Sequence, residues 1–382
     1  MKKSLVALAV LAAAGAASAQ SSVTLFGVAD LGYQYGKSAT NSLSRMGQDG
    51  IASSRLGFRG TEDLGGGMNA SFWLEAGISP DSGVGGGTNV NNQAGGAVAA
   101  GGGLIFNRRS TVSLGGGFGE LRLGRDYTAT FWNYTVFDPF GTNGVGTTRT
   151  LAGNGAATSI AGNLTQVRAS NAFGYFLPGN LGGFYGQFQY YKGENLSTAA
   201  AGKTGDGYAL RGGFANGPIN VALAVGQLKT GAAASHDTWN LGGSYDLGVA
   251  KLMGHYDAQD NTAGVKQTGY LLGATMPLGA GELKGSYSVS KTNAATSPKS
   301  TQWAVGYVHN LSKRTAVYAT LARVGNSGGA NAVLNGATAS VNNSSTGYDI
   351  GLRHTFGSPT RPVRVCMTKL KSHPSQDGWL FS

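Results

Sequence analysis

Residues that could catalyse a reaction or bind a metal do not stand at the spacings that such chemistry needs. The five histidines are scattered, with neither a His-Glu-x-x-His pair nor another metal-ligand spacing: His236, His255, His309, His354 and His373. Residues 201–204 read Ala-Gly-Lys-Thr, like the end of a phosphate-binding loop, but Ser197 replaces its first glycine. We therefore expect no metal and no cofactor. An enzyme site assembled from distant strands stays open as an alternative.

Arginines, in contrast, fall on the polar face of segments in which apolar and polar residues alternate. In residues 54–61, Leu56 and Phe58 point to one face, which leaves Arg55 and Arg59 on the other. The same parity places Arg168 on a polar face. Further charged residues share such faces: Asp30, Glu75, Glu120, Arg122, Asp126, Arg211, Lys251, Glu282, Lys284, Asp349 and Arg353. Fixed positive charges around an enclosed space would attract anions.

The elements that carry these residues are extended runs of about 9 to 12 residues with apolar side chains at every second position. We expect 16 such runs, beginning near Val23, Ser54, Met68, Arg108, Gly119, Ala169, Gly183, Gly205, Ile219, Asp237, Ala250, Val265, Gly281, Ser300, Thr315 and Tyr348. Short turns alternate with long loops at 36–52, 79–107, 128–167, 195–204 and 325–346. The loop 128–167 is too long to be structureless, and we expect it to fold into the interior.

The N-terminus predicts export. Residues 1–19 combine a basic start, a short apolar run and the sequence Ala17-Ser18-Ala19, which is the pattern of a cleaved signal peptide. The apolar run is too short to cross a bilayer core of about 30 Å as a helix. Cys366 is the only cysteine, so disulfides within the chain cannot stabilise it.

Composition narrows the fold class. Glycine supplies 65 of the 382 residues and charged residues only 12%, whereas aromatic residues reach 9%. Such a chain is too poor in helix formers for a soluble helical protein and too aromatic to be disordered. The net charge of +11 is scattered, which argues against nucleic-acid binding. An all-β transmembrane antiparallel barrel, with short periplasmic turns and long extracellular loops, fits best; a soluble sandwich or propeller is the alternative.

Several motifs, in the expected order, resemble one family of exported barrels. They occupy residues 22–30, 54–65, 106–110, 121–127 and 351–356. Together they resemble the Gram-negative general porins of the β-proteobacterial type, and the likeness runs through residues 23–356. It implies a 16-stranded trimeric diffusion channel in the outer membrane, whose third long loop folds inward as a constriction. Residues 20–356 would form this porin domain.

The resemblance also implies where the pore is narrowest. Arg55, Arg125 and Arg168 match the basic wall of the family, and we add Arg59 and Arg122 from their parity. Arg125 shares the parity of the apolar Leu121 and Leu123, so a lumen position requires a bulge or a place at the rim. Opposite this wall, Asp138 is the only carboxylate in residues 128–167. Its sequence Asp-Pro-Phe-Gly departs from the Pro-Glu-Phe-Gly of enteric relatives.

The expected function is passive diffusion of small hydrophilic solutes and ions through a water-filled outer-membrane channel that prefers anions. The alternatives are a solute-specific channel for phosphate or organic anions, a barrel enzyme and an adhesin. The expected partners are two further copies in a homotrimer, outer-membrane lipid and lipopolysaccharide, small anionic or neutral solutes, and the barrel assembly machinery.

The C-terminus departs most from the family. Such barrels end on the aromatic residue of the last strand, here Phe356, which is part of the assembly signal. Residues 357–382 continue beyond it, lose the alternation and carry three prolines and the cysteine. We expect this tail to be disordered on the periplasmic side, without a role in conduction, and to slow insertion.

Overall fold

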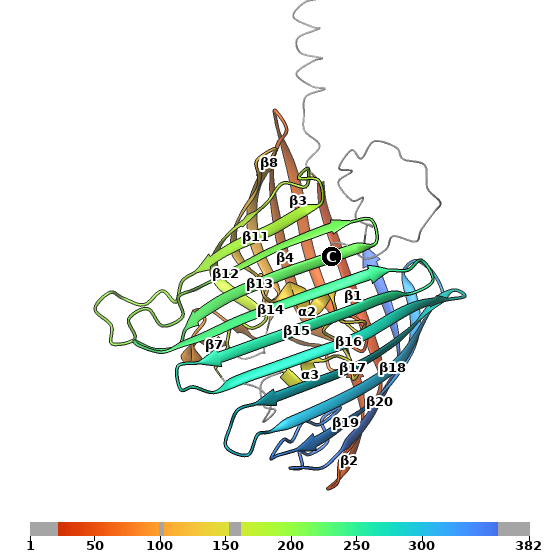
Figure 1. Cartoon of the computed structure of the whole chain (residues 1–382). Coiled ribbons are helices and arrows are strands. Elements are labelled where there is room, and N and C mark those ends of the chain that lie inside the picture. Colours follow the sequence, from red (N-terminus) through yellow and green to blue (C-terminus); the bar gives the residue numbers. More distant parts are fainter. Residues whose placement is uncertain (1–21, 99–102, 153–161, 358–382) are drawn as a thin grey trace, which may run out of the picture.

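The computed structural model describes residues 22–98, 103–152 and 162–357 (Figure 1). Its strands run antiparallel around a closed barrel, and β20 (Ser345–Gly357) pairs with β1 (Ser22–Lys37) to complete the circle. Sixteen strands form the wall, which confirms the predicted fold class. The expected signal peptide and the tail from 358 onward lie outside the described residues. No described helix is long and apolar enough to cross a membrane.

Each wall strand pairs with the next one along the chain, and the predicted starting points agree to within three residues. Between β1 and β20 the wall strands are β3 (Arg55–Gly65), β4 (Met68–Ser79), β8 (Arg109–Gly116), β9 (Gly119–Tyr127), β10 (Arg168–Phe176), β11 (Phe184–Tyr191), β12 (Gly207–Asn216), β13 (Ile219–Lys229), β14 (Ser235–Asp246), β15 (Lys251–Asn261), β16 (Lys266–Leu278), β17 (Gly281–Thr292), β18 (Lys299–Asn310) and β19 (Thr315–Ser327).

Apolar side chains cover the outside of the barrel and polar ones fill the inside. On β14, Trp239 and Leu241 are exposed on the outer face, whereas Asn240 between them is completely buried on the inner face. This arrangement inverts that of a soluble protein, because the hydrocarbon core of a bilayer is the solvent of the outer face. Every wall strand has a hydrogen-bonded neighbour on each side, so the closed ladder leaves no open edge in the membrane.

The first long loop is shorter than predicted, because β1 continues to Lys37 and β2 (Ser42–Gln48) returns along the C-terminal half of β1. β3 pairs with the N-terminal half of β1. Between these two strands, residues 49–54 leave the wall as an inner turn. Asp30 on the inner face of β1 accepts hydrogen bonds from the backbone N–H groups of Ile51 and Ala52 and from the hydroxyl of Tyr318.

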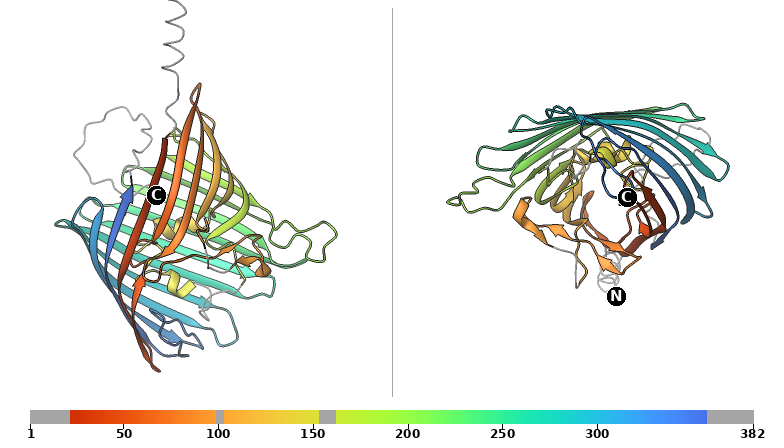
Figure 2. Two further views of the ribbon diagram at one scale, coloured as in Figure 1. Left: turned by 180° about the vertical axis from the view of Figure 1, so that it is seen from behind. Right: turned by 90° about the horizontal axis from the view of Figure 1, so that it is seen from below.

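The third long loop, residues 128–167, folds into the barrel as the sequence predicted, and we call it the constriction loop. It contains the short helices α2 (Phe131–Val136) and α3 (Arg149–Ala152), which lie inside the ring of strands in the view from below (Figure 2). Its tip meets the inner turn, where the Ser53 hydroxyl donates a 2.7 Å hydrogen bond to Asn143 Oδ1. The constriction loop and the inner turn therefore narrow the same cross-section of the pore.

Glycines on the inner wall make room for the constriction loop. A Cβ atom added at any of four positions would clash with it; the pairs are Gly242 with Phe137, Gly273 with Pro139, Gly306 with Phe140, and Gly347 with Val145. These glycines belong to β14, β16, β18 and β20. Because they lack a side chain, the apolar residues of the loop pack directly on the backbone of the wall. Asp349 adds a polar contact by accepting a 2.7 Å hydrogen bond from the Val145 N–H.

Candidate pore constriction

Three arginines gather on the wall around one carboxylate and one phenol. Arg108 Nε lies 2.6 Å from Glu75 Oε1, and Arg55 Nε lies 3.9 Å from the same oxygen. The hydroxyl of Tyr127 accepts hydrogen bonds from Arg108 at 2.7 Å and from Arg168 at 2.8 Å. We call Arg55, Arg108 and Arg168 the arginine cluster. With Glu75 as its only ion-pair partner among the described residues, the cluster holds an excess of positive charge.

The register of neighbouring strands brings the cluster together. Glu75 on β4 stands opposite Gly57 of β3 on one side and opposite Arg109 of β8 on the other. Arg108 directly precedes β8, and its backbone N–H donates to the carbonyl of Glu75. The site predicted from sequence does not include Arg108, although an alternating run is predicted to begin near this residue. The paired arginines at 108 and 109 were the only signal for it.

Arg59 and Arg122 lie apart from the arginine cluster. The guanidinium group of Arg59 sits 4.9 Å from the ring centres of both Phe26 and Trp73. Arg122 lies between two carboxylates, with Nε 2.9 Å from Glu120 and Nη1 2.6 Å from Asp126. Two acidic neighbours compensate the charge of Arg122, so this geometry favours a structural role for it rather than a place among the solute-facing cations.

Arg125 contacts the second long loop and, on the wall, Ser170 of β10. It donates hydrogen bonds to the backbone carbonyls of Asn107 (2.6 Å) and Asn89 (3.0 Å) and to the hydroxyl of Ser170 (2.7 Å). The pairing of β9 with β10 is irregular here: Ala169 pairs with Asp126 and Ala172 with Gly124, so two residues of β10 stand opposite the single Arg125 of β9. The inferred bulge is thus present, on the neighbouring strand β10. It directs Arg125 against the second long loop.

That second loop, residues 80–107, contains four short elements among its described residues: β5 (Val84–Gly85), β6 (Thr88–Asn89), the 3-10 helix η1 (Ala94–Gly96) and β7 (Ala97–Val98). The side-chain amide of Asn92 donates to the backbone carbonyls of Ser170 and Lys192, which fastens the loop to the ends of β10 and β11. Arg125 therefore holds this loop in place, and its role in the basic wall stays a prediction.

Asp138 is not turned toward the arginines. Its side chain is 4% exposed, and its two oxygens accept hydrogen bonds from the backbone N–H groups of Phe140 (2.8 Å) and Thr148 (2.9 Å). The carboxyl thus closes the constriction loop on itself. Burial raises its pKa to about 7, and the two N–H donors offset this rise only in part.

The stability of the docked constriction loop should therefore depend on pH, because Asp138 is buried within it. The pKa of Asp138 is raised above its ordinary value of 3.8, so the folded state favours the protonated carboxyl. The contribution of this carboxyl to the free energy of unfolding is therefore complete below pH 4 and is lost as the pH rises through 7. We expect the wild-type barrel to lose about 2 to 3 kcal/mol of stability between pH 5 and pH 8 through this group. Asp138→Asn, which stays neutral, should lack this step in calorimetric unfolding. An equal pH dependence in both proteins would contradict this assignment.

Aromatic rings of the constriction loop adjoin the arginine cluster. The ring of Phe131 on α2 stacks on Tyr127 at 4.9 Å between ring centres, and Trp132 meets the edge of Tyr127 at 5.3 Å. The Arg168 guanidinium lies 4.3 Å from the centre of the same tyrosine ring. Neither Tyr127, the last residue of β9, nor Trp132 of the constriction loop was among the predicted site residues, which are charged residues apart from Phe356.

A model of the Gram-negative porin family matches residues 4–329. This chain belongs to that family. Outer membrane porin protein 32 of Delftia acidovorans is 41% identical over 375 residues, which cover 93% of this chain and all of that protein. An outer membrane porin protein of Bordetella pertussis is 30% identical over 421 residues, with the same coverage of this chain and all of its own length.

Solved structures agree with this assignment to the porins. The anion-selective porin from Comamonas acidovorans is 37% identical, with a TM-score of 0.75 over 88% of this chain and 100% of that one. OmpT of Vibrio cholerae, at 14% identity, has a TM-score of 0.60 over 88% of this chain and 99% of its own, which shows the shared fold alone. The protein is an outer-membrane porin, and its sixteen strands cross the membrane.

Proposed function

We propose that this porin is a passive channel for small hydrophilic solutes, that it prefers anions, and that it has no enzymatic role. The observation that carries the proposal is the arginine cluster. Of its three guanidinium groups, those of Arg55 and Arg108 pair with the carboxylate of Glu75, whereas that of Arg168 donates a hydrogen bond to Tyr127 and has no ion-pair partner among the described residues. The constriction loop has no second carboxylate to balance them, and Asp138 is buried within it. The anion selectivity of the 37% identical Comamonas porin supports the same conclusion.

The size of the electrostatic effect is sufficient for selectivity. A unit charge 5 Å from a passing ion contributes about 1 kcal/mol in water and about 3 kcal/mol at an effective dielectric constant near 20. Salt at 0.1 M screens charges beyond about 10 Å, so cations elsewhere on the molecule act much less on the ion. Positive charges inside a narrow constriction therefore lower the entry barrier for anions and raise it for cations.

The test is the reversal potential of the purified protein in a planar bilayer under a potassium chloride gradient. We expect its sign to be that of a channel more permeable to chloride than to potassium. A potential near zero, or of the opposite sign, would overturn the anion preference while leaving the assignment to the porin family intact.

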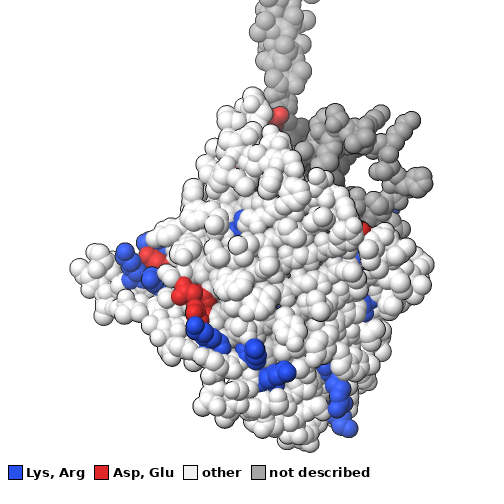
Figure 3. Space-filling view, in the orientation of Figure 1, with Lys and Arg blue, Asp and Glu red and all other residues white. Residues whose placement is uncertain are grey.

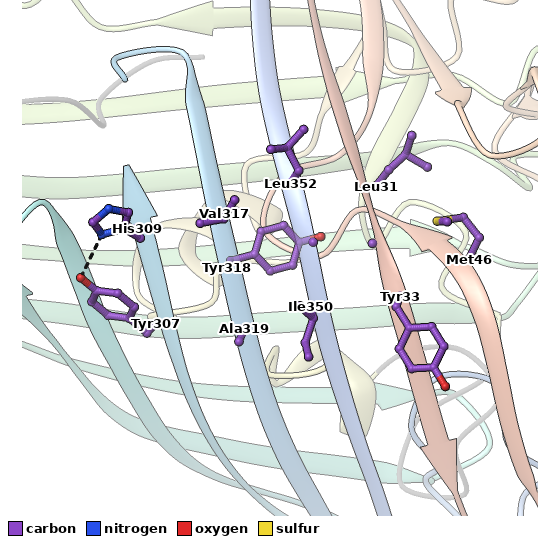
Figure 4. A pocket seen from close by; sticks show the side chains of 12 residues that line it. Leu31, Tyr33, Met46, Tyr307, His309, Val317, Tyr318, Ala319, Ile350 and Leu352 are labelled. Carbon is purple, nitrogen blue, oxygen red and sulfur yellow. Dashed lines mark hydrogen bonds between the residues drawn. The ribbon is translucent and has the colours of Figure 1, made fainter. Parts of the chain in front are cut away.

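We also propose that the porin acts as a homotrimer. An apolar hollow on the outer face of β1, β2 and β18–β20 supports a protein contact there (Figure 4). Leu31, Tyr33, Ile350 and Leu352 line it, and the figure shows these side chains on the outer side of the two seam strands. One structure of OmpT, which shares the fold, is described as a trimer.

Lipopolysaccharide is the proposed partner of the outer rim. Cationic side chains, exposed or partly exposed, stand near the extracellular ends of the strands: Lys229, Lys266, Lys291, Lys299 and Arg323. Figure 3 shows lysines and arginines, with some acidic residues among them, in a band across this part of the surface. Such a row suits the phosphate groups of an anionic lipid. We further propose that Phe356, which pairs with Gly27 at the closing seam, is recognised by the barrel assembly machinery.

A further inference from the structure

Trp132 presents an aromatic ring to the lumen. It lies on α2, whose residues Phe131, Asn133 and Tyr134 are buried. Asn133 fastens that helix to the wall, since its amide donates to the Ala222 carbonyl at 3.0 Å and to Asn240 Oδ1 at 2.7 Å. At about 100° per residue, Trp132 points away from this docked side. It is partly exposed, and its indole N–H has no hydrogen-bond partner among the described residues.

A guanidinium group lies against the tyrosine that Trp132 contacts. Arg168 sits 4.3 Å from the centre of the Tyr127 ring, and that ring is 5.3 Å from the centre of the Trp132 ring. Phe131 stacks on Tyr127 at 4.9 Å and holds it in place. Within the described part of the chain, Arg168 forms one side-chain hydrogen bond, to Tyr127, and no ion pair. Its charge is therefore not neutralised by a carboxylate of the wall.

We propose that Trp132, Tyr127 and Arg168 form a subsite for aromatic carboxylates in the constriction. The proposal rests on the anion preference proposed above and names a class of solute for it. An aromatic acid joins a flat ring to a carboxylate separated from the ring centre by about 3 Å, from standard bond lengths. A ring stacked on Trp132 with its carboxylate on the Tyr127 side would point that carboxylate toward Arg168. Guanidinium groups bind carboxylates through two parallel hydrogen bonds, and aromatic pairs add stacking.

A comparison of two acids of equal charge and similar size distinguishes binding at this subsite from simple attraction of anions. Benzoate has an aromatic ring, whereas cyclohexanecarboxylate has the same carboxylate on a saturated one. The measurement is the concentration of each acid that halves the chloride current through a single wild-type channel. We expect benzoate to block at a concentration roughly two- to tenfold lower than cyclohexanecarboxylate, because stacking favours only the aromatic ring.

Variants of Trp132 show whether this residue causes the preference for benzoate. Trp132→Leu keeps an apolar side chain but removes the ring, and it should bring the blocking concentration of benzoate to that of cyclohexanecarboxylate. Trp132→Phe restores a ring and should restore part of the preference. Potassium chloride conductance and reversal potential, measured on the same membranes, check that the constriction loop is still docked in each variant.

Equal block by the two acids in an anion-selective wild-type channel would overturn the subsite and leave the proposed function standing. A preference for benzoate that survives Trp132→Leu would overturn the role of Trp132. A wild-type channel without anion selectivity would instead contradict the proposed function. These three outcomes differ in the reversal potential or in the variant, so they cannot be confused.

Discussion

Replacing Arg55 and Arg168 together by alanine should lower the chloride-to-potassium permeability ratio about tenfold or more, because each guanidinium acts on a passing anion by about 1 to 3 kcal/mol. Arg108 would remain paired with Glu75 at 2.6 Å, so the pair that holds β4 to the start of β8 stays in place. The excess of positive charge would disappear. The reversal potential in a salt gradient would shift toward that of a cation channel.

The control for this prediction removes a cation outside the lumen. Lys266 is exposed at the outer rim, and Lys266→Ala should leave the reversal potential unchanged because salt screens a charge at that distance. Glu75→Gln should shift the reversal potential in the opposite direction. This variant keeps the shape of the side chain but removes the negative charge beside the arginine cluster, so it should increase the preference for chloride. If the double arginine variant kept the wild-type potential, the cluster would not be the selectivity filter.

Replacing Gly242 by valine should displace the constriction loop, since a Cβ atom at this position would occupy the place of the Phe137 ring. Overpacking of this kind costs about 1 to 3 kcal/mol, and the loop can avoid it by leaving the wall. The loop and the arginine cluster bound the same narrow section. We therefore expect a changed single-channel conductance together with a weaker anion preference, both measured in planar bilayers.

Gly212 provides a matched control on β12. A Cβ atom there meets no other atom within 4 Å, so Gly212→Val introduces the same side chain in open space on the outer face. This variant should insert and conduct like the wild type. Should Gly242→Val and Gly212→Val give the same conductance and selectivity, direct packing of the loop on the glycines would not control the pore.

Much of the barrel could be predicted from sequence because its wall obeys a local rule. Every strand alternates between a lipid-facing and a lumen-facing side chain, so residues such as Leu56 and Arg55 reveal their direction within a few positions. The sixteen starting points, and the folding of the third loop into the lumen, follow from the same alternation and from loop length. The inner turn was not predicted, because residues 49–54 show no periodicity. The conformation of this turn depends on hydrogen bonds to Asp30, about twenty residues earlier in the chain.

The site itself was decided by tertiary structure. Parity cannot show that β10 bulges beside Arg125, that the carboxyl of Asp138 is buried within its own loop, or that Arg108 joins Arg55 and Arg168 around Glu75. Those arrangements depend on contacts between strands and loops that are remote in the chain. The physical reason is that alternation is set by neighbouring residues, whereas charge compensation is set by whichever groups the closed barrel brings within a few ångströms. The sequence alone thus determined the barrel and the direction of most side chains, and the tertiary structure decided which arginines keep an uncompensated charge.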